Sequence, residues 1–261
     1  MLELARVKAD DAELGAAWSS PSVGGLVLGL ARTNEELEAI QRLRYNVFTK
    51  EMNAVFPDAV DGLDSDRFDP WCEHFMVKEA SSGRIVGTYR LLTPANAIKA
   101  GGYYSESEFD ISPLDGIRGT LAEVGRSCIH PDYRNGSVIM LLWSGIAALM
   151  QQGGYQYVLG CASVSLRDDG VTAAEVWRTA RKGMARNPGT PIVTPRHRYP
   201  VERLNSTLPA RVPPLIKGYL KLGASICGEP AWDPDFNTAD FPVLLDIDRV
   251  DPRYRRHFGL D

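Results

Sequence analysis

The chain has 261 residues, 44% of them hydrophobic and 24% charged, which is typical of a globular protein with a sizeable core. Its net charge of −4 argues against a general nucleic-acid binder. Residues 1–14 carry acidic and basic groups without an apolar stretch, and no run reaches ~18 uncharged apolar residues. We therefore expect no secretory signal, no membrane span and a location in the cytoplasm.

The cysteines give no sign of a disulfide framework or a metal centre. They are four in number and widely spaced: Cys72, Cys128, Cys161 and Cys227. Neither the paired spacing of metal ligands nor the density of a disulfide scaffold is present. We expect reduced thiols, mostly buried, and no metal site.

The first half of the chain predicts a helix, a long loop and a hairpin. Thr33 to Met52 begins with a capping box and continues with apolar residues at helical spacing. Val55 to Pro70 is rich in Asp, Gly and Pro, so it reads as a loop. His74 to Glu79 and Arg84 to Leu92 are strand-like runs around a Ser-Ser-Gly turn. We expect residues 1–24 to form an N-terminal arm and 25–261 a single domain.

A strand, turn, helix and strand follow in the middle of the chain. Leu121 to Ile129 and Tyr155 to Ser163 are the strands, and Ser137 to Gln152 is an apolar helix that ends at two glycines. The turn between the first strand and the helix reads HPDYRNG, where a phosphate-bearing ligand would meet the helix N-terminus. This order predicts a βαβ unit.

The C-terminal half is less regular. Thr172 to Ala185 and Pro214 to Leu222 read as helices, and Phe241 to Ile247 reads as a strand. The proline-rich stretch between the two helices reads as extended or loop-like. Because no linker separates this half, we expect it to extend the same domain.

Several segments resemble acyl-carrier-protein-dependent enzymes of the GNAT acyltransferase superfamily. They are RLRYNVF at 42–48, FDPWCEHFMV at 68–77, VGTYRLL at 86–92 and EVGRSCIHPDYRNG at 123–136. Acyl-homoserine lactone synthases share this order. CAS at 161–163, PPLIKGYLKLGA at 213–224 and NTADFPVLLDID at 237–248 are more similar to the ornithine N-acyltransferases that make lyso-ornithine lipid.

The resemblance implies an α/β (α+β) GNAT fold, with a mixed central β-sheet flanked by helices. It implies transfer of a long, 3-hydroxylated acyl chain from acyl carrier protein to the α-amine of ornithine. The alternatives are an N-acyl amino acid or acyl-homoserine lactone synthase with another acceptor, an acetyl-CoA transferase, and a non-catalytic module that binds lipid or carrier protein. No permanently bound cofactor is expected.

The resemblance places Glu123 on the strand that this superfamily splays open beside the thioester. Glu123 is then the candidate base for the amine proton, directly or through water. Arg126 would bind the acceptor carboxylate or steady Glu123. On a regular strand these two residues face opposite sides, and Gly125 between them suggests a bulge that turns both towards the cleft.

Arg44 and Arg90 lie in largely apolar elements, where a guanidinium needs a carboxylate or a bound anion. Asp61, Asp64 and Asp69 are the candidate partners. The pairs either hold the long loop over the cleft or contact substrate, and we assign Arg44, Phe48, Asp69 and Arg90 to the substrate site. Cys161 and Ser163 join them as candidate lining of the acyl or thiol path.

The turn before the apolar helix supplies the candidate donor site. It comprises Ile129, Arg134, Asn135, Gly136 and Ser137. GNAT enzymes that hold acetyl-CoA usually carry a second glycine here, which lets backbone amides close on the pyrophosphate. Its absence favours phosphopantetheine on acyl carrier protein over CoA. Basic residues on the helices near 178–186 and 217–221 are the candidate surface for that acidic carrier, or for peripheral contact with an anionic membrane.

Overall fold

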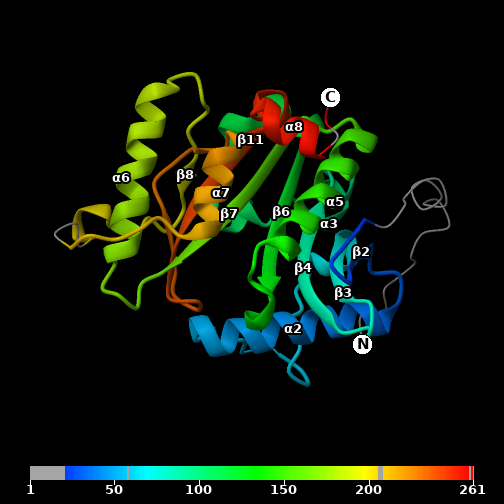
Figure 1. Cartoon of the computed structure of the whole chain (residues 1–261). Helices are drawn as coiled ribbons and strands as arrows, with labels where there is room; N and C mark the ends of the chain where they lie inside the picture. The colour runs from blue at the N-terminus through cyan, green and yellow to red at the C-terminus, as the bar shows by residue number, and fades with distance from the viewer. Residues whose placement is uncertain (1–20, 58, 205–207, 259, 261) are drawn as a thin grey trace.

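The computed structural model describes residues 21–57, 59–204, 208–258 and 260. Their core is one mixed sheet flanked by helices (Figure 1). Its main path runs β1 (Ser22–Val23), β2 (Leu26–Leu30), β3 (Glu73–Glu79), β4 (Ile85–Leu92), β6 (Leu121–Ile129), β7 (Tyr157–Ser165), β11 (Thr238–Asp246) and β10 (Ala231–Asp233), with β9 (Ser225–Ile226) also paired to β11. Within this sheet β6 and β7 are parallel and the other pairs are antiparallel, which confirms the expected mixed sheet.

Helices and short segments connect these strands. The helices are α2 (Asn34–Met52), α3 (Pro94–Ala100), α4 (Ser105–Glu108), α5 (Ser137–Gly153), α6 (Val171–Arg186), α7 (Pro214–Leu222) and α8 (Pro252–Phe258). The 3-10 segments are η1 (Asp69–Trp71), η2 (Ser112–Thr120), η3 (Pro131–Tyr133), η4 (Val201–Arg203) and η5 (Ile247–Arg249). β5 (Phe109–Asp110) and β8 (Thr194–Pro195) form a separate two-stranded sheet. None of the described helices is long and apolar enough to cross a bilayer.

The predicted elements are present with small shifts at their ends. Thr33 caps α2 by accepting a hydrogen bond from the Glu36 amide, 3.2 Å away. Glu36 completes the cap one residue early, because its carboxylate accepts from the Arg32 amide. β2, α3 and α4 were not predicted, since each is short and has little apolar period. Of the expected N-terminal arm, residues 1–20 lie outside the described residues, whereas Ser22–Val23 pairs with β2.

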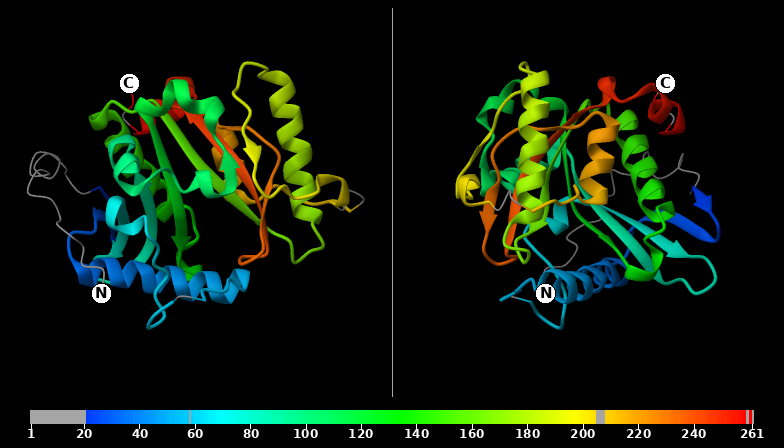
Figure 2. Two further views of the ribbon diagram at one scale, coloured as in Figure 1. Left: turned by 180° about the vertical axis from the view of Figure 1, so that it is seen from behind. Right: turned by 60° about the vertical axis from the view of Figure 1, so that its left-hand side comes forward.

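The alternation of β3 and β4 separates two layers. Phe75, Val77, Tyr89 and Leu91 face α5 and form one core with its apolar residues. The intervening side chains, including Arg90, face the side that α2 covers with its own buried stripe. In Figure 2, α2 runs along one end of the strands, away from α6 and α7. Alternate side chains of β4 therefore point to the apolar core under α5 or to the opposite face, where residues 55–57 and 59–70 lie.

The parallel strands β6 and β7 diverge after a short pairing. Their register covers Leu121 with Tyr157, Ala122 with Val158, and Glu123 with Leu159. Beyond that point β6 stays with β4 and β7 stays with β11, so a gap opens between them (Figure 1). Gly160 stands where the gap begins, and a Cβ there would lie 2.7 Å from the Val124 carbonyl oxygen. The fold thus splits its own sheet directly after Glu123.

Candidate active site

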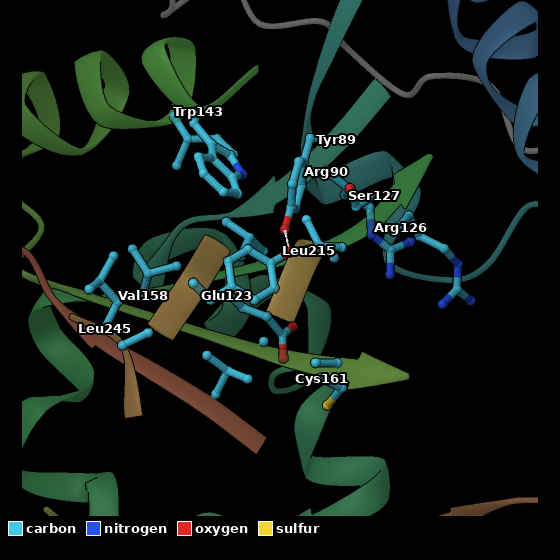
Figure 3. Close-up of a pocket in the computed structure, with 18 of the residues that line it drawn as sticks. Tyr89, Arg90, Glu123, Arg126, Ser127, Trp143, Val158, Cys161, Leu215 and Leu245 are labelled. Atoms are coloured by element: carbon cyan, nitrogen blue, oxygen red, sulfur yellow. Dashed lines mark hydrogen bonds between the residues drawn. The ribbon is translucent and has the colours of Figure 1, made fainter. Parts of the chain in front are cut away.

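A cavity of about 320 Å³ lies in the gap between β6 and β7 (Figure 3). This volume falls in the range of small-molecule sites. One end is polar and includes Ser105, Glu123, Arg126, Cys161 and Ser163. The other end is an apolar arm walled by α5, α7, β7 and β11. The cavity can therefore place a polar reacting group next to a long apolar chain.

Glu123 lies at the polar end and is 5% exposed. Its carboxylate accepts hydrogen bonds from the Tyr104 amide at 2.7 Å, the Ser105 amide at 2.7 Å and the Ser105 hydroxyl at 2.5 Å. It thus caps the first turn of α4. Burial raises the pKa of Glu123 and outweighs the lowering effect of these hydrogen bonds. A carboxylate with a raised pKa and a fixed position has the properties of a general base.

A bulge in β6 turns Arg126 to the same side as Glu123. The pairing with β4 matches Thr88 to Cys128 but Arg90 to Gly125, so two residues of β6 oppose Tyr89. Arg126 itself has φ +51°, in the left-handed region. The expected bulge is confirmed, and its strained residue is Arg126 rather than the glycine before it.

Three arginines and three aspartates form a buried network beside this end of the cavity. Its ion pairs join Arg44 to Asp64 at 2.9 Å and Asp69 at 2.8 Å, Arg90 to Asp66 and Asp69 at 2.7 Å each, and Arg126 to Asp64 at 3.4 Å and Asp66 at 3.2 Å. Burial alone would raise the pKa of Asp69, but Arg44 and Arg90 outweigh it and hold this pKa well below its usual range. The long loop is therefore held to the sheet by matched charges.

The network corrects one predicted partner and adds another. Asp61 is not a partner: its carboxylate forms no ion pair with Arg44 or Arg90, and its backbone carbonyl accepts a hydrogen bond from Arg42 at 3.0 Å. Asp66 was missed, although its spacing of two from Asp64 and three from Asp69 in one loop was a usable signal. His74 is packed below the network, with Nε2 2.9 Å from the Asp69 carbonyl oxygen. His74 is therefore a buried, hydrogen-bonded residue.

The other predicted substrate residues divide between the network and the cavity. Asp69 and Arg44 lie behind the wall, whereas Phe48, Arg90, Cys161 and Ser163 line the cavity. The Cys161 sulfur is 3.4 Å from the Ser105 hydroxyl. Burial raises the pKa of Cys161 well above its usual value, so the thiol stays neutral and is a poor nucleophile.

Aromatic and aliphatic side chains form the apolar arm. Trp143 of α5 packs on Tyr219 of α7 with ring centroids 5.7 Å apart, and the Tyr219 hydroxyl is hydrogen-bonded to that of Tyr89. Gly218 permits this contact, because a Cβ there would lie 2.6 Å from the Trp143 ring. Most apolar residues of α5 belong to the core, and Trp143 and Ile146 also line the cavity.

The predicted donor turn is not part of the cavity wall. Arg134 donates to the Ile129 carbonyl at 2.9 Å and pairs with Glu51 at 2.8 Å. The Ser137 amide donates to the Asn135 side chain at 3.1 Å. Gly136 precedes α5 with φ +98°, a conformation that favours glycine. The turn is thus closed by its own hydrogen bonds.

Sequence reasoning missed a second set of acidic residues near the polar end. Glu108, Asp233 and Asp240 come from α4, β10 and β11, and their carboxylate oxygens lie within 4.8 Å of one another. Asp240 pairs in register with Ser163, a predicted site residue. The only signal in the sequence was an Asp in the otherwise apolar strand around Phe241.

Comparisons with known proteins agree with this architecture. Residues 43–144 match the family model of the acetyltransferase (GNAT) domain. The fold is shared with FeeM, an N-acyl amino acid synthase from uncultured soil microbes, with a TM-score of 0.53 and 13% identity over 86% of this chain and 92% of that one. It is also shared with the AHL synthase LasI, with a TM-score of 0.50 and 12% identity over 92% and 95% of the two chains.

Curated relatives are closer in sequence. The L-ornithine N(alpha)-acyltransferase of Brucella abortus is 34% identical over 92% of this chain and 90% of that protein. The enzyme of the same name from Agrobacterium fabrum is 35% identical, over 91% and 86% of the two chains. The protein is therefore an acyltransferase with a GNAT domain, and it belongs to the family of L-ornithine N(alpha)-acyltransferases.

Proposed function

We propose that the protein transfers a long, 3-hydroxylated acyl group from acyl carrier protein to the α-amine of ornithine, as the first step of ornithine lipid synthesis. The observation that carries this proposal is a single cavity that joins an apolar arm to a polar end with Glu123. An acyl chain in the arm would bring its thioester carbonyl to the split between β6 and β7. The acceptor, the chain length and the hydroxyl group follow from the family resemblance.

The reaction needs a base and no covalent intermediate on the protein. The neutral α-amine attacks the thioester carbonyl, and a C–N bond forms. The tetrahedral intermediate then collapses, the C–S bond breaks, and the thiolate leaves with the carrier. Glu123 accepts the amine proton, which finally reaches the thiolate. The raised pKa of Glu123 supports this role, because it makes the carboxylate a stronger base.

Arg126 is the proposed partner of the acceptor carboxylate. It lines the cavity on the same side as Glu123, and its ion pairs to Asp64 and Asp66 are the longest in the network, at 3.4 and 3.2 Å. Its guanidinium carbon also lies 5.1 Å from the Tyr104 ring centroid. These contacts support a cation that is fixed in place yet retains capacity for an incoming carboxylate.

The closed donor turn supports acyl carrier protein as the carrier. Because Arg134 and the Ser137 amide already have partners within the chain, a pyrophosphate would have to displace them. Phosphopantetheine on a carrier protein has no such group. We expect a lower kcat/KM with acyl-CoA than with acyl carrier protein at equal chain length. Equal or better kinetics with acyl-CoA would contradict this assignment.

The function is tested by incubating the purified protein with 3-hydroxyacyl carrier protein and ornithine, and by identifying the product by mass spectrometry. The expected product is ornithine acylated on its α-nitrogen, with the δ-amine free. Fragmentation distinguishes it from the δ-acyl isomer. Homoserine lactone, other amino acids and acetyl-CoA serve as competing substrates, and preference for any of them over ornithine with an acyl carrier donor would overturn the proposal.

A further inference from the structure

Three acidic side chains converge beside the polar end of the cavity. Glu108 ends α4, Asp233 ends β10, and Asp240 lies in β11, with their carboxylate oxygens within 4.8 Å of one another. Asp233 and Asp240 line the cavity, whereas Glu108 does not. The three side chains come from separate parts of the sequence and meet only through the fold.

No basic side chain compensates these acids among the residues that the structure describes. Asp240 accepts a hydrogen bond from the Thr238 hydroxyl at 2.7 Å, and one oxygen of Asp233 accepts from the amides of Asp235 and Phe236. Both carboxylate oxygens of Glu108 are sealed from solvent, and neither has a hydrogen bond of regular geometry from a described residue, although Tyr104, Cys161 and Asp240 lie beside them. Buried acids of this kind destabilise a fold unless a cation joins them.

The pKa values of Glu108 and Asp240 also show that no nearby positive charge of a described residue stabilises their ionised forms. Burial and the neighbouring Asp240 raise the pKa of Glu108 well above its usual value, and the nearby Tyr104 hydroxyl and Cys161 thiol offset this only in part. Burial raises the pKa of Asp240 to about 6. A bound cation would reverse both effects by stabilising the ionised carboxylates.

Cys161 lies between the acidic group and the proposed reacting centre. Its sulfur is 3.4 Å from the Ser105 hydroxyl, which binds Glu123, and burial together with Glu108 and Asp240 raises the pKa of this thiol. Glu123, Cys161 and Asp240 all line the cavity. An amino acid with its α-amine near Glu123 can therefore extend its side chain past Cys161 towards Asp240.

We propose that Glu108, Asp233 and Asp240 form the subsite for the side-chain ammonium of the acceptor, and that they select a diamino acid over a neutral one. This assignment rests on the proposed function. Asp233 and Asp240 contact the ammonium from the cavity wall, and Glu108 adds negative charge next to Asp240. The selected class is a short α,ω-diamino acid with its side-chain amine protonated.

The test compares ornithine with norvaline, which has the same carbon chain but no side-chain amine. In the wild type we expect a large ratio of kcat/KM for ornithine to kcat/KM for norvaline. Asp240→Asn should lower this ratio by about 30-fold or more, in line with the loss of a buried charge pair. Asp233→Asn and Glu108→Gln should lower it as well, with norvaline constants unchanged within about twofold.

Asp235→Asn is the matched control. Asp235 is exposed, lies two residues from Asp233 and is not part of the acidic group. This variant removes one carboxylate from the same turn and should leave the ornithine to norvaline ratio unchanged. The melting temperatures of all variants are measured without ligand, and Asp240→Asn should melt at or above the wild-type temperature. A ratio that falls in Asp235→Asn as far as in Asp240→Asn would overturn the proposal, because surface charge would then explain both.

Amino-acid binding is followed by calorimetry in parallel, so that the two proposals can fail separately. A wild type that binds ornithine more tightly than norvaline, but forms no N-acyl product, would refute the proposed function and support the subsite. A wild type that acylates ornithine, with an unchanged ratio in Asp240→Asn and Asp233→Asn, would refute the subsite alone. Activity that is lost on chelation, regained with Mg²⁺, Ca²⁺ or Mn²⁺, and insensitive to chelation in Asp240→Asn would overturn the subsite in favour of a metal site.

Discussion

Two sets of buried and half-buried acids lie at the polar end of the cavity, and they differ in how their charge is balanced. Asp64, Asp66 and Asp69 are each paired with arginines at 2.7 to 3.4 Å. In the described part of the chain, no arginine, lysine or histidine forms an ion pair with Glu108, Asp233 or Asp240. Paired charges hold a loop in place, whereas unpaired charges lower stability and are retained where a ligand completes them.

The largest effect is expected from removing one charge of the paired set. Asp69→Asn leaves Arg44 and Arg90 buried beside too little negative charge, so the free energy of unfolding should fall by about 3–5 kcal/mol. Urea denaturation measures it. The control is Asp61→Asn, which removes an exposed carboxylate from the same loop and should change stability little. Equal losses in the two variants would show that the network does not anchor the loop.

Glu123 represents a third arrangement, because hydrogen bonds and no direct ion pair hold its carboxylate among the described residues. Glu123→Gln should lower turnover by roughly 100-fold or more, the usual range for loss of a general base. A near-normal rate would remove Glu123 from that role.

The variant Ser105→Ala tests whether Glu123 acts as a base or only supports the fold. It deletes one hydrogen bond that lowers the pKa of Glu123 and leaves both backbone amides in place. A base of higher pKa loses its charged form at higher pH. The acid limb of the kcat profile should therefore move upward in Ser105→Ala, a shift that a purely structural carboxylate would not cause.

The two acid sets should also give opposite pH dependences of stability. Asp240 binds its proton more tightly in the folded chain than at its ordinary pKa of 3.8, so its contribution to the free energy of unfolding falls as the pH rises from about 4 through about 6. The pKa of Asp69 is lowered, so its contribution is present above pH 3.8 and falls on acidification. The groups facing Asp240 are Glu108, Asp233, Ser163, Thr238, Tyr104 and Cys161.

Unfolding curves at several pH values measure these slopes. Asp240→Asn should remove most of the decline between pH 4 and 6, which corresponds to about 1–3 kcal/mol. It should leave the loss below pH 4 intact, because that loss belongs to the arginine network. A decline that survives in Asp240→Asn and in Glu108→Gln would mean that other groups cause it.

The smallest effect is expected at exposed charges, where solvent screens both signs. Arg178, Arg181 and Lys182 lie exposed on α6, and Arg178 is already paired with Glu175. Reversing these three residues to Glu should raise KM for the carrier-bound donor by about tenfold and leave KM for ornithine nearly unchanged. The matched reversal is Arg253→Glu with Arg256→Glu on α8. If only the α8 variant changes the donor KM and its salt dependence, α6 is not the docking face.

The sequence predicted best where a local pattern determines the structure. α7 and β6 have the predicted ends, and a proline marks the start of α7. The resemblance supplied Glu123, Arg126 and the split strand. The bulge could be inferred from the incompatible parity of Glu123 and Arg126, since a regular strand cannot turn both to one side.

Long-range placement could not be predicted in the same way. Asp64, Asp66 and Asp69 share one loop, so the choice of arginine partner depends on how that loop folds over β4. Glu108, Asp233 and Asp240 come from far-apart parts of the sequence, and the elements that carry Glu108 and Asp233 are short. The local sequence around Glu108 and Asp233 does not distinguish them from surface acids, and Asp240 differs only in its apolar neighbours. Only the pairing of β11 with β7 brings Asp240 beside Ser163.

The short pairing of β6 with β7 has a mechanical consequence. Three residue pairs join these strands, whereas nine join β7 to β11. The short pairing is thus a narrow link between the two halves of the sheet. The helices that pack across the gap then set its width. Trp143 of α5 and Tyr219 of α7 form such a contact. If the apolar arm holds the acyl chain, as we propose, its preferred length can change through the packing of these helices while Glu123 and Arg126 keep their positions.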